Sequence, residues 1–210
     1  MIDQPTVHVV DDDDSMRRSL ARLLGGAGYR IASYATAEEF LAAAGPALTG
    51  CLLLDLRLPG ASGLELQDLM VERGCALPTV FLTGHGDVPA SVRAMKHGAV
   101  DFLQKPVIAD ELFAAVSAAL TKDDARLRQT REESDLDALR ARVAGLSARQ
   151  REVWLRVVRG ELNKQIAIDL GIVDRTVKLH RAKAMEKLGA RSMADLVRIA
   201  ERLGLTQPMD

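Results

Sequence analysis

The chain has 210 residues, of which 48% are hydrophobic and 27% charged, a composition close to that of ordinary globular proteins. No apolar run approaches the roughly 18 residues that a membrane span needs, and the apolar run at residues 7–10 is too short for a signal peptide. We therefore expect a cytoplasmic protein without membrane contact. Cys51 and Cys75 lie far apart without metal-ligand spacing, which favours two buried, reduced thiols.

The net charge of −1 hides an asymmetry along the chain. Residues 1–122 contain 10 Lys and Arg against 15 Asp and Glu, whereas residues 146–205 contain 13 against 7. A basic C-terminal part beside an acidic N-terminal part indicates a polyanionic partner for the C-terminal part, although many basic surfaces are simply solvated.

Short β-rich runs alternate with helical patterns over the first 120 residues. The runs cover residues 7–10, 30–34, 51–54, 79–82 and 101–103. Apolar residues at helical spacing lie between or after them: Met16, Leu20, Leu23 and Leu24; Leu64, Leu66, Leu69 and Met70; Val88, Val92 and Met95; and Leu112, Val116 and Leu120. This alternation predicts a doubly wound α/β domain, with about five parallel strands and helices on both faces.

The rest of the chain has no strand pattern. Residues 122–145 are rich in Asp, Glu and Arg with a sparse apolar stripe, which predicts a helical linker continuous with the preceding helix; a flexible tether is the alternative. From residue 146 onward the pattern is all helical. We therefore predict three parts: residues 1–121, a linker over 122–145, and an all-α domain over 146–210.

Capping residues and glycines divide that all-α domain into four helices. Ser147 precedes residues 148–159, Asn163 precedes a short helix over 164–170, Asp174 precedes a helix to residue 188, and Ser192 precedes a helix through residue 203. A short helix, a glycine turn at Gly171 and a longer helix are typical of a helix-turn-helix.

Polar side chains follow the predicted strands at their carboxyl ends, where ligands bind in parallel α/β sheets. Asp11 and Asp12 follow the first strand and Asp55 the third, while Thr83 and Lys105 follow the fourth and fifth. Close carboxylates suit Mg²⁺, and Asp55 could act as the nucleophile that forms an aspartyl-phosphate, with Thr83 and Lys105 contacting phosphoryl oxygens. The neighbouring Asp13 and Asp14 are equally well explained as a solvated helix cap.

The segments VHVVDDDDSMRRSL, LLLDLRLPGASGLEL and LTGHGDVPASVRAMKHGAVDFLQKP resemble a receiver domain over residues 5–120. The resemblance implies that Asp11, Asp12, Asp55 and the Arg57 carbonyl bind the metal, and that Asp55 accepts the phosphoryl group. It also implies a phosphate-sensing set of Thr83, Lys105 and the aromatic Phe102. In this family the Lys105–Pro106 bond is often cis. The TGHGDVP segment resembles FixJ-like regulators, and we interpret its His85 as a loop residue.

The segments LSARQREVW, NKQIAIDLGI and TVKLHRAKAMEKLGARS resemble a LuxR-type helix-turn-helix over residues 146–205. On the longer helix Val177, Ala184 and Leu188 form a core-facing stripe. The candidate DNA contacts lie on its other faces, at the edge of that stripe and at the start of the preceding helix: Lys164, Arg175, Thr176, Lys178, Leu179, Arg181 and Lys183. Two departures from the family occur, namely Val173 at the usual serine cap, where Asp174 could cap instead, and Ala182 at a position that is basic in some relatives. The last helix of such domains pairs DNA-bound subunits.

The order of the two domains resembles two-component response regulators of the FixJ/NarL-like type. The resemblance implies a protein that is not an enzyme and whose partners are a sensor histidine kinase, double-stranded DNA and RNA polymerase. Phosphorylation of Asp55 would favour a homodimer through the face around residues 88–97, or release an inhibitory contact between domains, and so regulate transcription, with activation favoured. A phosphatase of the haloacid-dehalogenase type usually needs an acid two residues after the nucleophile, where this chain has Arg57. A transcription factor gated by a small molecule would not need the acidic cluster, and a normal response of Asp55→Ala would favour it.

Overall fold

The computed structural model describes residues 4–60, 62–84 and 98–206. The chain divides into two compact units, Met1–Leu127 and Arg128–Asp210, which are described separately. The helix predicted from Val88, Val92 and Met95 lies outside the described residues, and so does His85, which was interpreted as a loop residue. Among the described helices, none is both long and apolar enough to span a bilayer.

The first unit is built on a five-stranded parallel sheet, as predicted. Its strands are β1 (Thr6–Val10), β2 (Arg30–Tyr34), β3 (Cys51–Asp55), β4 (Thr79–Thr83) and β5 (Asp101–Gln104), in the order β2-β1-β3-β4-β5. Every neighbouring pair runs parallel, and Val10 lies opposite both Tyr34 and Leu54. The carboxyl ends of the central strands β1 and β3 are therefore adjacent.

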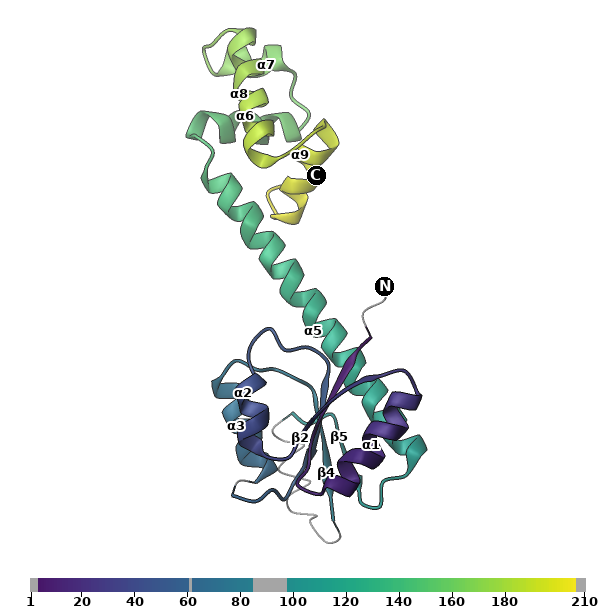
Figure 1. Cartoon of the computed structure of the whole chain (residues 1–210). Helices are drawn as coiled ribbons and strands as arrows, with labels where there is room; N and C mark the ends of the chain where they lie inside the picture. The colour runs from purple at the N-terminus through teal and green to yellow at the C-terminus, as the bar shows by residue number, and fades with distance from the viewer. Residues whose placement is uncertain (1–3, 61, 85–97, 207–210) are drawn as a thin grey trace. The chain divides into compact units, whose positions relative to one another are not determined.

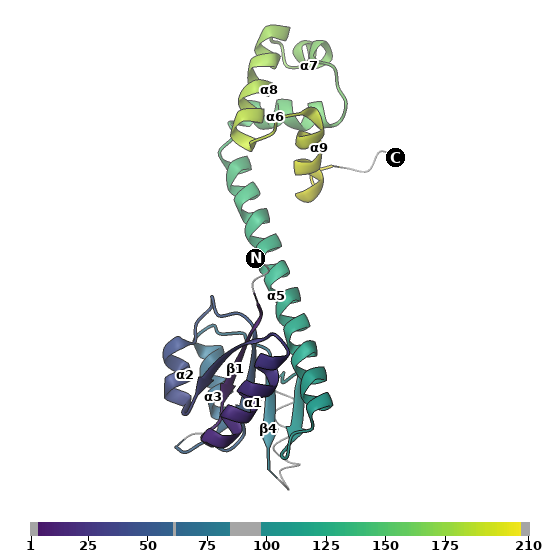
Figure 2. The same ribbon diagram turned by 45° about the vertical axis from the view of Figure 1, so that its right-hand side comes forward.

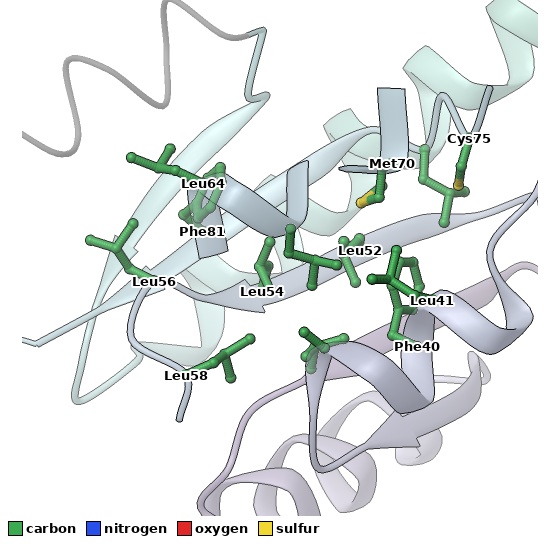
Figure 3. Close-up of a cluster of buried hydrophobic side chains, with 14 of the residues drawn as sticks. Phe40, Leu41, Leu52, Leu54, Leu56, Leu58, Leu64, Met70, Cys75 and Phe81 are labelled. Atoms are coloured by element: carbon green, nitrogen blue, oxygen red, sulfur yellow. The ribbon is translucent and has the colours of Figure 1, made fainter. Parts of the chain in front are cut away.

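Helices cover both faces of this sheet (Figures 1 and 2). One face carries α1 (Asp14–Gly26) and the first part of α5 (Ala109–Ala144), and the other carries α2 (Ala37–Ala43) and α3 (Gly63–Glu72). The residues of β3 alternate between the two cores: Leu53 packs with Leu24 and Leu112, whereas Leu52 and Leu54 pack with Phe40 (Figure 3). The short helix α2 was not among the predicted helical stripes, because Phe40 and Leu41 are its only large apolar residues.

Side-chain caps fix the starts of helices α1 and α3 in this unit. Asp13 accepts hydrogen bonds from the backbone N–H groups of Ser15 and Met16, so it caps α1. At α3, Ser62 and Glu65 form a reciprocal capping box. The alternative explanation of Asp13 as a helix cap is therefore correct.

The amino-terminal end of the sheet is fastened to α5 through Asp123, which is only 3% exposed. Its Oδ2 accepts the backbone N–H of Gly50 at 2.7 Å, and its Oδ1 lies 2.6 Å from Nη2 of Arg126, which also donates to the Leu48 carbonyl at 3.2 Å. Gly50 has a φ of 112°, and a Cβ there would stand 1.9 Å from the Thr6 carbonyl oxygen. Only glycine therefore lets this loop approach β1 so closely while its N–H bonds to Asp123 of α5.

A buried histidine lies in β1. His8 is 3% exposed, with Nδ1 3.3 Å from the Tyr34 hydroxyl and Nε2 3.2 Å from the Thr49 carbonyl oxygen. A neutral ring that donates from Nε2 and accepts at Nδ1 satisfies both partners. Burial lowers the pKa of His8 and outweighs the opposing effects of Thr49 and Asp123.

The second unit contains the end of α5 followed by α6 (Ala148–Val158), α7 (Asn163–Asp169), α8 (Asp174–Leu188) and α9 (Met193–Arg202). The segment predicted as a helical linker is continuous with the preceding helix in α5, as expected. Trp154 is completely buried in the core of this unit, and its Nε1 donates to the Leu196 carbonyl at 3.3 Å. That core joins the four short helices: Val153, Trp154, Val157, Ile166, Ala167, Val177, Ala184, Leu188, Leu196 and Ala200.

The predicted caps of the second unit are half right. Ser147 and Ser192 accept backbone N–H groups of α6 and α9, as expected. The helix α7 instead begins at Asn163 with Leu162 in the cap position, and α8 begins at Asp174 with Val173 in the cap position. Asn163 and Asp174 are thus first helical residues and not caps, because each helix begins one residue earlier than the preference for a polar cap would suggest.

Both cysteines are buried as free thiols, as predicted. Cys51 is 0% and Cys75 2% exposed, and they pack in the cores on opposite faces of the sheet. Burial, with a smaller contribution from the charge of Asp123, raises the pKa of Cys51 to about 12. The Cys51 thiol is therefore a poor nucleophile at neutral pH.

Candidate functional site

Three carboxylates meet at the carboxyl-terminal edge of the sheet. Asp11 directly follows β1 and Asp55 is the last residue of the adjacent strand β3, so parallel pairing brings them together. Asp12 is exposed, whereas Asp11 is 0% and Asp55 7% exposed. Oxygen atoms of the three carboxylates all lie within 4.8 Å of one another. This set of hard oxygen donors suits a small divalent cation such as Mg²⁺.

Lys105 supplies the positive charge of the cluster. It directly follows β5, and its Nζ donates to Asp11 Oδ2 at 2.7 Å and to Asp55 Oδ2 at 2.6 Å. Burial alone would lower the pKa of Lys105, but the hydrogen bonds to the two carboxylates outweigh it and raise that pKa. For Asp11 burial dominates, so its pKa is raised despite the hydrogen bonds from Lys105 and from the backbone of Asp13.

Backbone contacts orient the two buried carboxylates. The Arg57 N–H donates to Asp55 Oδ1 at 3.0 Å, and the Asp13 N–H donates to Asp11 Oδ1 at 2.9 Å. Beneath Asp55, the first residue of α3 is Gly63, where a Cβ would stand 2.5 Å from the Asp55 carbonyl oxygen. The close passage of α3 thus requires glycine and fixes the loop that carries the Arg57 carbonyl, the predicted fourth ligand.

One residue of this site was not predicted from the sequence. Arg17, in the first turns of α1, donates from Nη1 to the Asp11 carbonyl at 2.6 Å and from Nη2 to Asp14 Oδ1 at 3.0 Å. It therefore ties the acidic loop to the helix that follows it. The spacing of three residues between Asp14 and Arg17 is the one sequence signal for it, and such pairs are common on any helix.

The other predicted switch residues lie along the neighbouring strands. Thr83 ends β4, is 4% exposed, and its hydroxyl donates to the Gly84 carbonyl at 3.1 Å. Phe102 in β5 is half-buried, with its ring centre 6.3 Å from that of Phe81. The peptide bond between Lys105 and Pro106 is cis. Thr83 thus ends the strand next to that of Asp55, whereas Phe102 lies in β5, one strand further along the sheet, and Lys105 directly follows it. Among these three, Lys105 is the one that hydrogen-bonds to Asp55.

In the second unit, α7 and α8 form a helix-turn-helix around Gly171. Val177, Ala184 and Leu188 of α8 face the core, as the sequence predicts. Five of the seven predicted DNA contacts are exposed and two are half-buried. The exposed ones are Lys164, Arg175, Lys178, Leu179 and Lys183, and the half-buried ones are Thr176 and Arg181.

The exposed side chains of α8 differ in their chemistry and in whether they already have a partner within the helix. Leu179 is 51% exposed on the surface of α8, and the nearby Ile168 and Val173 are more exposed still, at 80% and 67%. Lys178 Nζ lies 2.7 Å from Asp174 Oδ2, so an internal acid partly neutralises it at the start of α8. The exposed surface of α8 therefore carries Arg175, Lys178 and Lys183 together with the apolar Leu179.

These two units, a doubly wound domain with an acidic carboxyl-terminal edge and a helix-turn-helix domain, define a DNA-binding response regulator. Residues 7–117 match the response regulator receiver domain family, and residues 144–200 match the LuxR family of bacterial regulatory proteins. The chain belongs to the response regulators that combine these two domains, as the sequence analysis expected.

Similar proteins match this chain along most of their length. The chain is 45% identical to nodulation protein W of Bradyrhizobium diazoefficiens over 95% of this chain and 87% of that protein. It is also 45% identical to the transcriptional regulatory protein FixJ of Azorhizobium caulinodans over 97% of this chain and 95% of that one. Among solved structures, the response regulator StyR matches with a TM-score of 0.78 at 44% identity, covering 95% of this chain and 99% of that chain.

Proposed function

We propose that Asp55 accepts a phosphoryl group from a sensor histidine kinase, and that this modification controls DNA binding by residues 146–210. The observation that carries the proposal is the position of Lys105, whose ammonium bridges Asp11 and Asp55 at 2.7 and 2.6 Å. A single cation between two buried acids can follow a new negative charge on either one. We assign residues 1–121 to the receiver and 122–145 to the linker.

The phosphoryl transfer needs a carboxylate nucleophile and a site for added negative charge. An oxygen of Asp55 attacks phosphorus, the phosphorus–nitrogen bond of the kinase phosphohistidine breaks, and an aspartyl-phosphate forms. Asp11, Asp12, Asp55 and the Arg57 carbonyl would hold Mg²⁺, which supplies charge neutralisation for the phosphoryl oxygens. The three carboxylates fit this role, because their oxygens already lie within 4.8 Å of one another.

The switch follows from the contacts that the new phosphoryl group offers. Lys105 can exchange a carboxylate partner for a phosphoryl oxygen, and the Thr83 hydroxyl, now bonded to the Gly84 carbonyl, can turn toward another. Phe102 belongs to β5, the strand that Lys105 directly follows, and packs against the core, so it can move with that strand. Phosphorylation shifts the protein toward its active conformation only by the amount by which these contacts are stronger in that conformation than in the inactive one.

The response is increased occupancy of a two-fold DNA site by a homodimer. The helix α8 would lie in the major groove, with Arg175, Lys178 and Leu179 near base edges and Lys164 near phosphates. Two linked domains bind two half-sites more tightly than one through effective concentration. We propose activation of transcription through RNA polymerase as the outcome, as the resemblance to FixJ-type regulators suggests.

Phosphorylation with a small donor tests the proposal without the kinase. The protein is incubated with Mg²⁺ and acetyl phosphate, and its mass and its affinity for duplex DNA are measured for the wild type and for Asp55→Asn. We expect the wild type to gain one phosphoryl group and to bind DNA more tightly as a dimer, and Asp55→Asn to do neither. Asp124→Asn, a change at an exposed acid of α5, is the control and should behave as wild type. An unlabelled wild type, or a DNA affinity that ignores the label, would refute it.

A further inference from the structure

Within the second unit, a cationic side chain from the carboxyl end of α5 caps the end of α8, and one from the end of α8 caps the end of α5. Arg142, in the last turn of α5, donates from Nη1 to the carbonyl of Leu188, the last residue of α8, at 3.3 Å. Lys187, in the last turn of α8, donates from Nζ to the carbonyl of Gly145, just beyond the end of α5, at 2.9 Å. Arg142 and Lys187 together are called the cap pair below.

The cap pair offsets the electrostatic repulsion between two neighbouring helix carboxyl ends. The last carbonyl groups of a helix lack partners inside the helix and carry a partial negative charge. Two carboxyl ends placed side by side therefore repel each other unless cations stand between them. Each member of the cap pair supplies that cation to the other helix, so the two helix ends are joined in both directions.

The local backbone is shaped around this contact. Gly189 follows α8 with a φ of 70°, and a Cβ there would stand 3.1 Å from Nη1 of Arg142. The guanidinium of Arg142 thus occupies the space beside the glycine. Apolar packing supports the same face of α5, because Leu139 is only 9% exposed and Val143 packs against the core around Trp154.

From this contact we propose that the cap pair sets the orientation of the recognition helix relative to the linker, which makes Arg142 and Lys187 positioning residues for DNA binding by the dimer. The inference rests on the function proposed above. Residues 145–173 separate the recognition helix α8 from α5 in the sequence, yet the cap pair joins the two helices directly. In a phosphorylated dimer, two recognition helices fixed to their linkers would match half-sites at one spacing.

Removing the hydrogen bonds of the cap pair should weaken the preference of the dimer for one half-site spacing. A recognition helix that turns freely on its linker reaches each half-site at a lower effective concentration, so the dimer gains less from its second contact. It also tolerates half-sites at other spacings. Binding of a single unit to DNA, by contrast, stays unchanged, because neither side chain is among the proposed base or phosphate contacts.

The test compares Arg142→Gln, Lys187→Gln and their combination with wild type, in the full-length protein phosphorylated by acetyl phosphate. The probes are duplexes selected from a random pool by the phosphorylated wild type, with the selected half-site spacing and with 5 base pairs inserted, about half a helical turn. Arg140→Gln is the matched control, since Arg140 is an exposed arginine of α5 that pairs with Asp137 of the same helix. Arg142→Lys keeps the positive charge, so it should retain part of the gain in affinity and of the spacing preference that Arg142→Gln loses.

We expect the wild type and Arg140→Gln to lose most of the phosphorylation-dependent gain in affinity when the insertion is made. The combined variant should show that gain reduced about tenfold at the selected spacing, with nearly equal affinity for both spacings. The salt dependence of its unphosphorylated binding should equal that of the wild type, whereas loss of a phosphate contact would lower that slope by about 0.9. The Trp154 fluorescence of each variant reports that the unit is folded, and Lys187→Gln provides a milder change at an exposed side chain.

Two results would overturn the inference alone: variants that keep the wild-type gain and spacing preference, or a reduced salt slope that makes Arg142 or Lys187 a phosphate contact. A wild type without any phosphorylation-dependent gain would instead refute the proposed function, and the inference with it. The two failures are therefore distinguishable in the same binding series.

Discussion

Replacing Asp123 with alanine should destabilise the first unit by about 3 kcal/mol. Asp123 is 3% exposed and accepts the Gly50 N–H at 2.7 Å, and its removal leaves that donor without this partner, at a cost of about 1–3 kcal/mol. The ion pair with Arg126, at 2.6 Å, is lost as well. Because the Arg126 side chain is 23% exposed, solvent screens this pair, and we add only about 1 kcal/mol for it.

The single tryptophan makes the assay specific to one unit. Trp154 lies in the second unit and is the sole tryptophan of the chain, so its fluorescence reports the unfolding of that unit, whereas far-UV circular dichroism reports both. In urea, Asp123→Ala should shift the dichroism transition of the first unit down by about 1–2 M and leave the Trp154 midpoint unchanged. Asp124→Ala, at the exposed neighbouring residue, is the control.

The reasoning would be wrong if the dichroism midpoints of Asp123→Ala and Asp124→Ala coincided. Such a result would mean that Gly50 finds another acceptor, or that water replaces the carboxylate at no cost. Asp123→Asn keeps an acceptor oxygen and should fall between the wild type and the alanine variant. An asparagine variant as unstable as the alanine variant would show that the charge, and not the hydrogen bond, holds α5 in place.

Three further outcomes follow from the acidic site, the buried His8 and the recognition helix. Lys105→Gln removes the ammonium that competes for Asp11 and Asp55, so Mg²⁺ should bind several-fold more tightly by calorimetry while the phosphorylation-dependent gain in DNA affinity disappears; weaker Mg²⁺ binding would contradict this. The lowered pKa of His8 means that the unfolded chain takes up its proton first, so stability should fall as pH drops below 6.5, by at most about 1.4 kcal/mol per pH unit, and His8→Gln should lack this contribution in urea titrations at pH 5 and 8. Arg175→Ala should cost about 1–3 kcal/mol of DNA binding and relax base preference at one position, measured by selection from a random pool; an equal loss on all sequences would make it a phosphate contact.

The edge of the sheet was predictable because parallel topology makes strand ends converge. Asp11, Asp55 and Lys105 lie far apart in the sequence, yet each follows or ends a β-rich run, and parallel pairing then places them within hydrogen-bonding distance. The recognition helix was predictable for a similar reason, since the spacing of Val177, Ala184 and Leu188 defines its buried side.

Other features depend on tertiary contacts that no local pattern carries. Asp123 belongs to a charged stretch predicted as linker, and only the approach of the Gly50 loop buries it. The helix α2 has few apolar residues and was missed. Leu162 and Val173 occupy cap positions without a side-chain hydrogen bond, so preferences for polar caps misplaced the starts of α7 and α8 by one residue.

The burial of both native thiols makes the wild-type chain a background for site-specific labelling. Cys51 and Cys75 are at most 2% exposed, and a pKa of about 12 keeps Cys51 protonated at neutral pH, so maleimide reagents react slowly with them. A cysteine introduced at the exposed Arg18 in the first unit and another at Arg191 in the second would each be labelled selectively. Spin or fluorescent labels at these positions can then follow the separation of the two units as acetyl phosphate is added, in a protein that keeps its native cores intact.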